Sequence, residues 1–245
     1  MPTEPTKVRV DPRVRALREI AERLTAKQPA GEDGHSTWHQ VHAHVVRHVV
    51  RLADAAEALY NLRVTRDPTQ TPDAHTKRVG LAAERFNKDI TATFNHINKV
   101  IGDWERDIAA RIAAKTNLVP DAYAAEIRAV YRSKSPTEQM ELINEFVAQN
   151  RAAELAAVIK APASLTGMSD EHRARYEAAY VAKHAPGEVA EKEALEDAFN
   201  DALVVTNTAG ALAKAYSDPD KLAEIAKAEA VAATAQQAFN KLTAA

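Results

Sequence analysis

The stretch from Asp73 to Thr116 constrains this chain more than any other, because it has a continuous apolar stripe and contains no proline. Only Gly80 and Gly102 weaken its helical character. A helix of about 43 residues would be about 65 Å long, several times the usual length in globular proteins. Such a helix must be a hairpin arm, a coiled-coil strand or a rod buried along its length. The stripe consists of Val79, Phe86, Ile90, Phe94, Ile97, Ile101, Trp104, Ile108 and Ile112.

Two helices are predicted before this long one. Asp11 and Pro12 form a cap and first turn for a helix that reaches about Ala26. Ser36 is placed to cap the next helix, whose apolar stripe continues to about Val64. The proline-containing turn at 66–72 is short, so this helix and the long one should pack antiparallel. We therefore expect an extended arm at 1–11 and a long helical hairpin region at 12–116.

The rear of the chain, 117–245, is expected to form a helical bundle with alanine-rich C-terminal helices. Ser135 to Glu138 has the pattern of a capping box, Ser169 can cap another helix, and 184–187 is a break. Ser217 to Pro219 ends one helix and begins the last. The predicted fold is all-α and elongated, with a domain boundary at 117–121. The last helix has near-heptad spacing, and its expected inner stripe is Leu222, Ile225, Ala232, Gln236 and Phe239.

Composition removes several classes of function. Aromatic residues make up 5% of the chain and glycine is scarce at seven residues, which favours close-packed helices over a sheet. There is no cysteine, so disulfides, thiolate nucleophiles and iron–sulfur clusters are excluded. The sequence has no apolar run of about 18 residues, so we expect no membrane span, and Met1 to Val10 lacks the apolar stretch of a secretory signal.

Histidine is the one unusual local feature, with five residues between 35 and 48. Imidazole binds zinc, nickel or copper, and histidines four residues apart can share an ion. On a helical wheel, His35, His39 and His42 lie on one flank of the apolar stripe, and His44 and His48 lie on the other. We interpret these histidines as lying at the boundary between core and solvent, and we expect no metal site. The alternatives are a metal site, with the first three residues as its ligand candidates, or a pH-responsive or anion-facing strip.

Motifs for catalysis are absent from the sequence. It contains no phosphate-binding G-x-x-x-x-G-K, no G-x-G-x-x-G and no G-x-S-x-G. Di-iron bundles need Glu-x-x-His on two helices, and this spacing occurs only once, from Glu32 to His35. We therefore expect a protein that is not an enzyme, with no catalytic residue and no cofactor.

Charge is distributed unevenly, with a net +3 over 1–66, +2 over 67–136 and −7 over 137–245. The basic front could contact phosphates without base specificity, or the two ends of neighbouring copies could attract each other. No aromatic residue is interleaved with the basic ones, so stacking on single strands is not expected. The candidate residues for DNA contact are Lys7, Arg9, Arg13, Arg15 and Arg18.

The stretch from Ala161 to Glu171, followed by Arg173, Arg175, Tyr176 and the 184–186 segment, resembles small proteins of tailed bacteriophages. Those proteins accompany head and virion structural proteins. The resemblance implies a virion structural or internal protein of ejection or scaffold type, found in the host cytoplasm during assembly and then in the particle. Its partners would be further copies of itself and other virion proteins. The expected helix–helix contact residues are Phe86, Ile90, Ile97, Trp104 and Ile108.

Overall fold

The computed structural model describes residues 10–27 and 37–243, and all regular secondary structure in these ranges is α-helical. The predicted all-α fold class is therefore confirmed. Contacts within the chain divide it into two compact units. The first unit comprises Met1–Ile101 with Glu196–Ala245, and the second comprises Gly102–Leu195. Two long helices, α3 (Pro72–Thr116) and α9 (Pro186–Ser217), contribute residues to both units.

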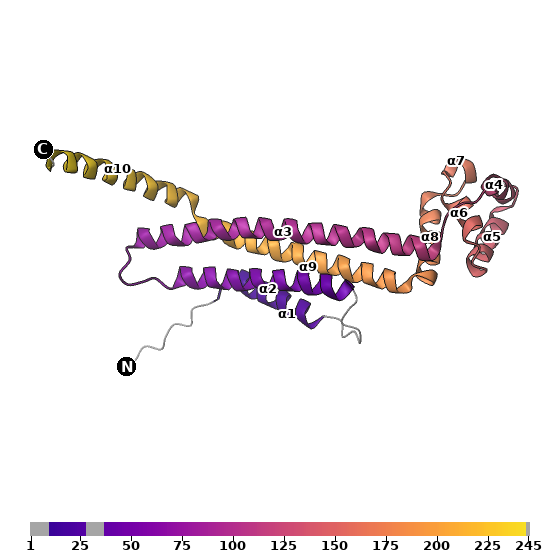
Figure 1. The fold of residues 1–245 in the computed structure, drawn as a ribbon, viewed down its shortest axis with the longest axis horizontal. Coiled ribbons are helices and arrows are strands. Elements are labelled where there is room, and N and C mark those ends of the chain that lie inside the picture. Colours follow the sequence, from indigo (N-terminus) through magenta and orange to yellow (C-terminus); the bar gives the residue numbers. More distant parts are fainter. Residues whose placement is uncertain (1–9, 28–36, 244–245) are drawn as a thin grey trace. The chain divides into compact units, whose positions relative to one another are not determined.

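The first unit contains the front part of α3, the rear part of α9, and the helices α1 (Pro12–Ala26), α2 (Thr37–Val64) and α10 (Pro219–Thr243). In Figure 1, α1, α2, α3 and α9 lie together, and most of α10 extends away from them. Each of α1, α2, α3 and α9 buries an apolar stripe, and the fully buried side chains of this core include Leu17, Leu24, Val45, Leu52, Ile97 and Leu212.

The start of α1 follows from its sequence. The Asp11 side chain accepts a hydrogen bond from the Arg13 backbone N–H at 2.9 Å, and Pro12 occupies the first helical position. The same carboxylate pairs with the Arg13 guanidinium and accepts a 2.9 Å hydrogen bond from the Tyr216 hydroxyl. Asp11 therefore caps α1 and also joins it to the end of α9.

Helices α2 and α3 run antiparallel, because their cross-contacts pair rising with falling residue numbers. His44 meets His96, Arg51 pairs with Asp89, and the His75 ring lies 3.1 Å from the Arg63 carbonyl oxygen. The turn between the two helices at 65–71 places these residues in register. This register determines which polar side chains face each other on the two helices.

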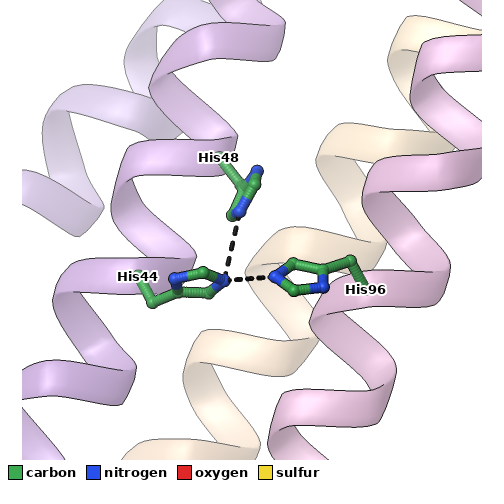
Figure 2. A group of neighbouring side chains, drawn as sticks. All are labelled: His44, His48 and His96. Carbon is green, nitrogen blue, oxygen red and sulfur yellow. Dashed lines mark hydrogen bonds between the residues drawn. The ribbon is translucent and has the colours of Figure 1, made fainter.

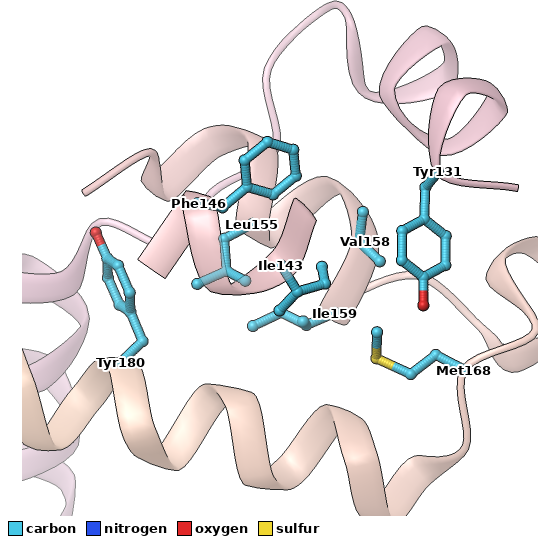
Figure 3. Close-up of a cluster of buried hydrophobic side chains, with 8 residues drawn as sticks. All are labelled: Tyr131, Ile143, Phe146, Leu155, Val158, Ile159, Met168 and Tyr180. Carbon is cyan, nitrogen blue, oxygen red and sulfur yellow. The ribbon is translucent and has the colours of Figure 1, made fainter. Parts of the chain in front are cut away.

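The second unit folds around a cluster of apolar side chains from several short helices (Figure 3). These helices are α4 (Ala124–Arg132), α5 (Pro136–Ala148), α6 (Ala152–Ile159), α7 (Ala163–Thr166) and α8 (Asp170–His184). Residues 155–159 of α6 are all buried, so this helix lies at the centre of the unit. The drawn cluster is Tyr131, Ile143, Phe146, Leu155, Val158, Ile159, Met168 and Tyr180.

Local signals determine where these short helices begin and end. The capping box of Ser135 and Glu138 is present in both directions, which confirms that prediction, and Ser169 caps α8 as expected. Asn150 separates α5 from α6 with φ of 59°, a left-handed conformation that asparagine tolerates better than most residues. Between α6 and α8 the chain forms the single turn α7, which Gly167 ends with φ of 74°.

Ion pairs join the end of α3 to the start of α9 within the second unit. Arg111 contacts Glu191 at 2.5 Å, and Lys115 contacts Glu188 at 2.7 Å. The Glu188 side chain is only 7% exposed, so its charge depends on these partners. The expected boundary at 117–121 lies inside this unit, which spans residues 102–195. The second part of α9 belongs to the first unit, where Asp201 pairs with Arg23 of α1 and Phe199 contacts Phe94 of α3.

Replacing a side chain at the centre of the second unit should cost about 2–5 kcal/mol of unfolding free energy, because Leu→Ala leaves a cavity. Leu155 is 0% exposed, whereas Val130 in the same unit is 53% exposed. We expect Leu155→Ala to lower the urea midpoint strongly, and the control Val130→Ala to change it little. Equal effects of the two substitutions would contradict the core described above.

The Asp11 carboxylate predicts a pH dependence of stability. The side-chain hydrogen bond from Arg13 lowers the pKa of Asp11 to about 2 from its ordinary 3.8. A lowered folded-state pKa stabilises the protein above about pH 3.8, and this contribution is lost as the pH falls towards 2. We expect Asp11→Asn, which can still cap α1, to be less stable by about 2 kcal/mol at pH 7. In urea titrations this difference should shrink below pH 4, and a difference independent of pH would exclude the ion pair as its cause.

Candidate functional site

Three histidines from two helices meet in the first unit (Figure 2). His44 and His48 lie one turn apart on α2, and His96 faces them from α3. The Nε2 atom of His44 is 2.7 Å from Nε2 of His96 and 3.1 Å from Nε2 of His48. We call these three residues the histidine cluster. One ring nitrogen from each lies within 4.8 Å of the other two.

The rings are tilted against one another rather than stacked. Interplanar angles are 66° between His44 and His48, 57° between His44 and His96, and 65° between His48 and His96. A neutral imidazole nitrogen has either one N–H or one lone pair in the ring plane. Because Nε2 of His44 faces two other ring nitrogens, it serves both contacts best as the acceptor. In that case His96 and His48 each donate an Nε2–H to the single lone pair of His44. When the three rings carry their protons on Nδ1 instead, three Nε2 lone pairs lie close together.

The surroundings of His44 and His48 favour the neutral form of these two rings. Burial, followed by the neighbouring His96 and Arg47, lowers the pKa of His44. Burial and the adjacent His44 are the largest of the causes that lower the pKa of His48. Deprotonated imidazole is the form that ligates metals.

Two arginines lie near these rings, and each has a different environment. Arg51 is paired with Asp89 and also donates to the Thr93 hydroxyl at 3.2 Å, so its charge is balanced locally. Arg47 is exposed to solvent, which screens its charge. The positive charge close to the cluster is therefore smaller than the arginine count suggests.

The metal candidates proposed from the sequence do not form this cluster. His35 lies outside the described residues, and His39 belongs to α2 although its side chain is not among those described. His42 is buried at 3% exposure and is not one of the grouped ligands. The flank that sequence analysis set aside, with His44 and His48, receives the third histidine from α3. A signal was available, since the turn at 65–71 places residues near 92–96 opposite residue 44.

A second feature of the first unit is an exposed apolar face on α10. Ile225 is the last buried residue of this helix, and all residues from 226 to 243 are exposed. Six of them lie within an arc of about 100° at 100° per residue. Val231, Phe239 and Leu242 are 66%, 60% and 81% exposed. We call this set, Ala228, Val231, Ala232, Ala235, Phe239 and Leu242, the α10 face.

The inner stripe expected for the last helix requires a correction. Ile225 is buried and Leu222 is half-buried, with its methyl groups against Gly80 of α3. Ala232, Gln236 and Phe239 are exposed, so no helix of the described chain covers them. The periodicity identified an apolar face, but burial within the chain ends at Ile225, one turn before Glu229, which pairs with Lys77 of α3 at 2.5 Å.

Two of the three described basic candidates for DNA contact, Arg13 and Arg18, pair with carboxylates of the protein itself. Lys7 and Arg9 lie outside the described residues. Arg13 pairs with Asp11, and Arg18 pairs with Asp54 at 2.7 Å and with Glu57. Arg15 is exposed. Internal carboxylates thus compensate two of the positive charges that phosphates would need.

The five expected helix–helix contact residues are all on α3 and all buried within the chain. Phe86, Ile90 and Ile97 belong to the first unit, and Trp104 and Ile108 to the second. Since their exposure is at most 7%, these side chains pack inside the protein. Contacts with another molecule must therefore use other surfaces.

No protein family, curated protein or solved structure matches the chain. Within the described residues, no helix is both long enough and apolar enough to span a lipid bilayer. The histidine cluster and the α10 face are the two features of the described chain that point to a function.

Proposed function

We propose that this chain is a non-enzymatic assembly protein that pairs α10 with α10 of a second copy. The observation that carries the proposal is the exposure of every residue from 226 to 243 on a helix with a defined apolar face. This segment would be about 27 Å long, which offers a partner about five helical turns. A partner that covers the α10 face would remove large apolar side chains from solvent.

The α10 face has the spacing of a coiled-coil seam. From Ile225 the apolar positions follow at intervals of three and four residues, through Ala228, Ala232, Ala235 and Phe239 to Leu242. None of these positions is charged. Alanine in the middle of the seam lets two helix backbones approach closely, because its side chain is small.

An antiparallel pairing of two copies fits these side-chain sizes best. In that arrangement Phe239 of one copy faces Ala228 of the other, and Ala232 faces Ala235. Phe239, the largest residue of the α10 face, then meets an alanine in each half of the pair. A parallel pairing would place Phe239 against its own counterpart, which would splay the helices at that end.

The setting of this assembly is proposed from the sequence. The 161–186 stretch resembles proteins that accompany tailed-phage head and virion proteins, so we place the protein in such a particle. In the structure these residues serve the fold of the second unit: Met168 is in its core, and the Ala161 carbonyl accepts a hydrogen bond from Arg173. The contact with other copies is therefore assigned to α10 rather than to this stretch.

Light scattering on a size-exclusion column tests the pairing. We expect the full chain to have the mass of two copies and Phe239→Glu to have the mass of one, because a charge would replace a residue whose burial contributes about 1.5–3 kcal/mol per copy. Gln237→Glu is the matched control, since it adds the same charge two residues away on the opposite side of the exposed helix. A monomeric wild-type chain at high concentration, or a dimeric Phe239→Glu variant, would refute the proposal.

A further inference from the structure

We propose that His44, His48 and His96 bind one divalent late transition-metal ion, with Zn²⁺ as the first choice. The three residues bring ring nitrogens from α2 and α3 to one point, which no other described group of histidines and carboxylates does. Imidazole nitrogen is a preferred ligand of zinc, nickel and copper ions. The site goes beyond the proposed assembly function, because α10 takes no part in it.

The distances between the nitrogens agree with a single ion. Zinc–nitrogen bonds of about 2.0–2.1 Å in a tetrahedral site place ligand nitrogens about 3.3 Å apart. The contacts of His44 with His96 and His48 are 2.7 and 3.1 Å, and all ligand atoms lie within 4.8 Å. Small rotations of the rings would therefore centre an ion between them. Without an ion, the single in-plane lone pair of His44 Nε2 has to accept hydrogen bonds from both neighbouring rings.

The positions of the three residues suit the coordination. Residues four apart on a helix lie on the same side, so His44 and His48 present their rings together. His96 comes from a second helix whose register with α2 is also fixed by the Arg51–Asp89 pair. Three protein ligands leave a fourth position for water or another ligand, as in open zinc sites. An ion would therefore link α2 to α3 and remain accessible, because His96 is exposed.

One ring nitrogen of the proposed ligands has no hydrogen-bond partner on the side that faces away from the ion. Nδ1 of His48 is buried and has no hydrogen-bond partner. Ligating histidines usually donate the other ring N–H to an acceptor, and loss of such a partner costs about 10–100-fold in metal affinity. We therefore expect weaker binding than in a fully supported three-histidine site, but selective for ions that prefer nitrogen. Mg²⁺ and Ca²⁺, which prefer oxygen ligands, should not bind at the cluster.

Calorimetric titration of the full chain with ZnCl₂, after tag removal and EDTA dialysis, tests the site. We expect about one Zn²⁺ per chain, and a loss of affinity of at least about tenfold in His96→Ala. His96 is exposed, so its removal should leave the fold intact, which circular dichroism can verify. The control is His172→Ala, which removes an exposed histidine of the second unit and should bind Zn²⁺ as the wild type does.

Thermal unfolding and Co²⁺ absorption provide independent readouts. Zn²⁺ should raise the melting temperature of the wild type and of His172→Ala but not of His96→Ala, since only a ligand that prefers the folded state stabilises it. Co²⁺ should give the intense visible bands of four-coordination, and these should be lost in His48→Ala. The proposal is overturned if the wild type binds no Zn²⁺ at about 100 µM, or if His96→Ala binds it with unchanged affinity. Neither result depends on whether the chain is a dimer.

Discussion

The burial of α3 is the constraint on which the rest of the structure depends. A helix of 45 residues with one apolar stripe cannot remain exposed along that stripe without a large cost in free energy. The chain covers the stripe with different partners along its length. In the first unit these include α2 and the second part of α9, and in the second unit the start of α9 contributes ion pairs. The need to cover one helix thus explains why residues 196–217 return to the unit of the N-terminal helices.

Local chemistry explains why the helices were predictable and their partners were not. Asp11 with Pro12, Ser135 with Glu138, and Pro219 each determine a helix start through groups within a few residues. The stripe on α3 likewise predicted its buried side chains, because helical periodicity depends only on the sequence itself. Which helices cover a stripe depends on the whole chain. This is why the return of α9 to the first unit could not be read from spacing.

The histidine cluster illustrates the same limit at the level of a site. The wheel of α2 alone separated His42 from His44 and His48, but it contained no information about the facing helix. His96 becomes a neighbour through the antiparallel register of α2 and α3, which the turn at 65–71 and the Arg51–Asp89 pair maintain. A site made from two helices can be predicted only after the register between them is known. The short turn at 65–71 predicts this register approximately. Without the register, the sequence cannot show which flank of α2, the one with His42 or the one with His44 and His48, faces a histidine of α3.

The alanines of α10 allow this helix to form before a partner binds, while its few large apolar side chains provide the contact area for that partner. Alanine has the highest helix propensity, so a helix rich in it loses little when its face is uncovered. A sequence richer in large apolar residues would bind a partner more strongly but would also expose more apolar surface in the free chain. On α10 the large side chains Val231, Phe239 and Leu242 stand among alanines, so the α10 face supplies contact area while it exposes only three large apolar side chains. Because the helix is already formed before the second copy arrives, pairing requires little ordering of the backbone and loses correspondingly little entropy.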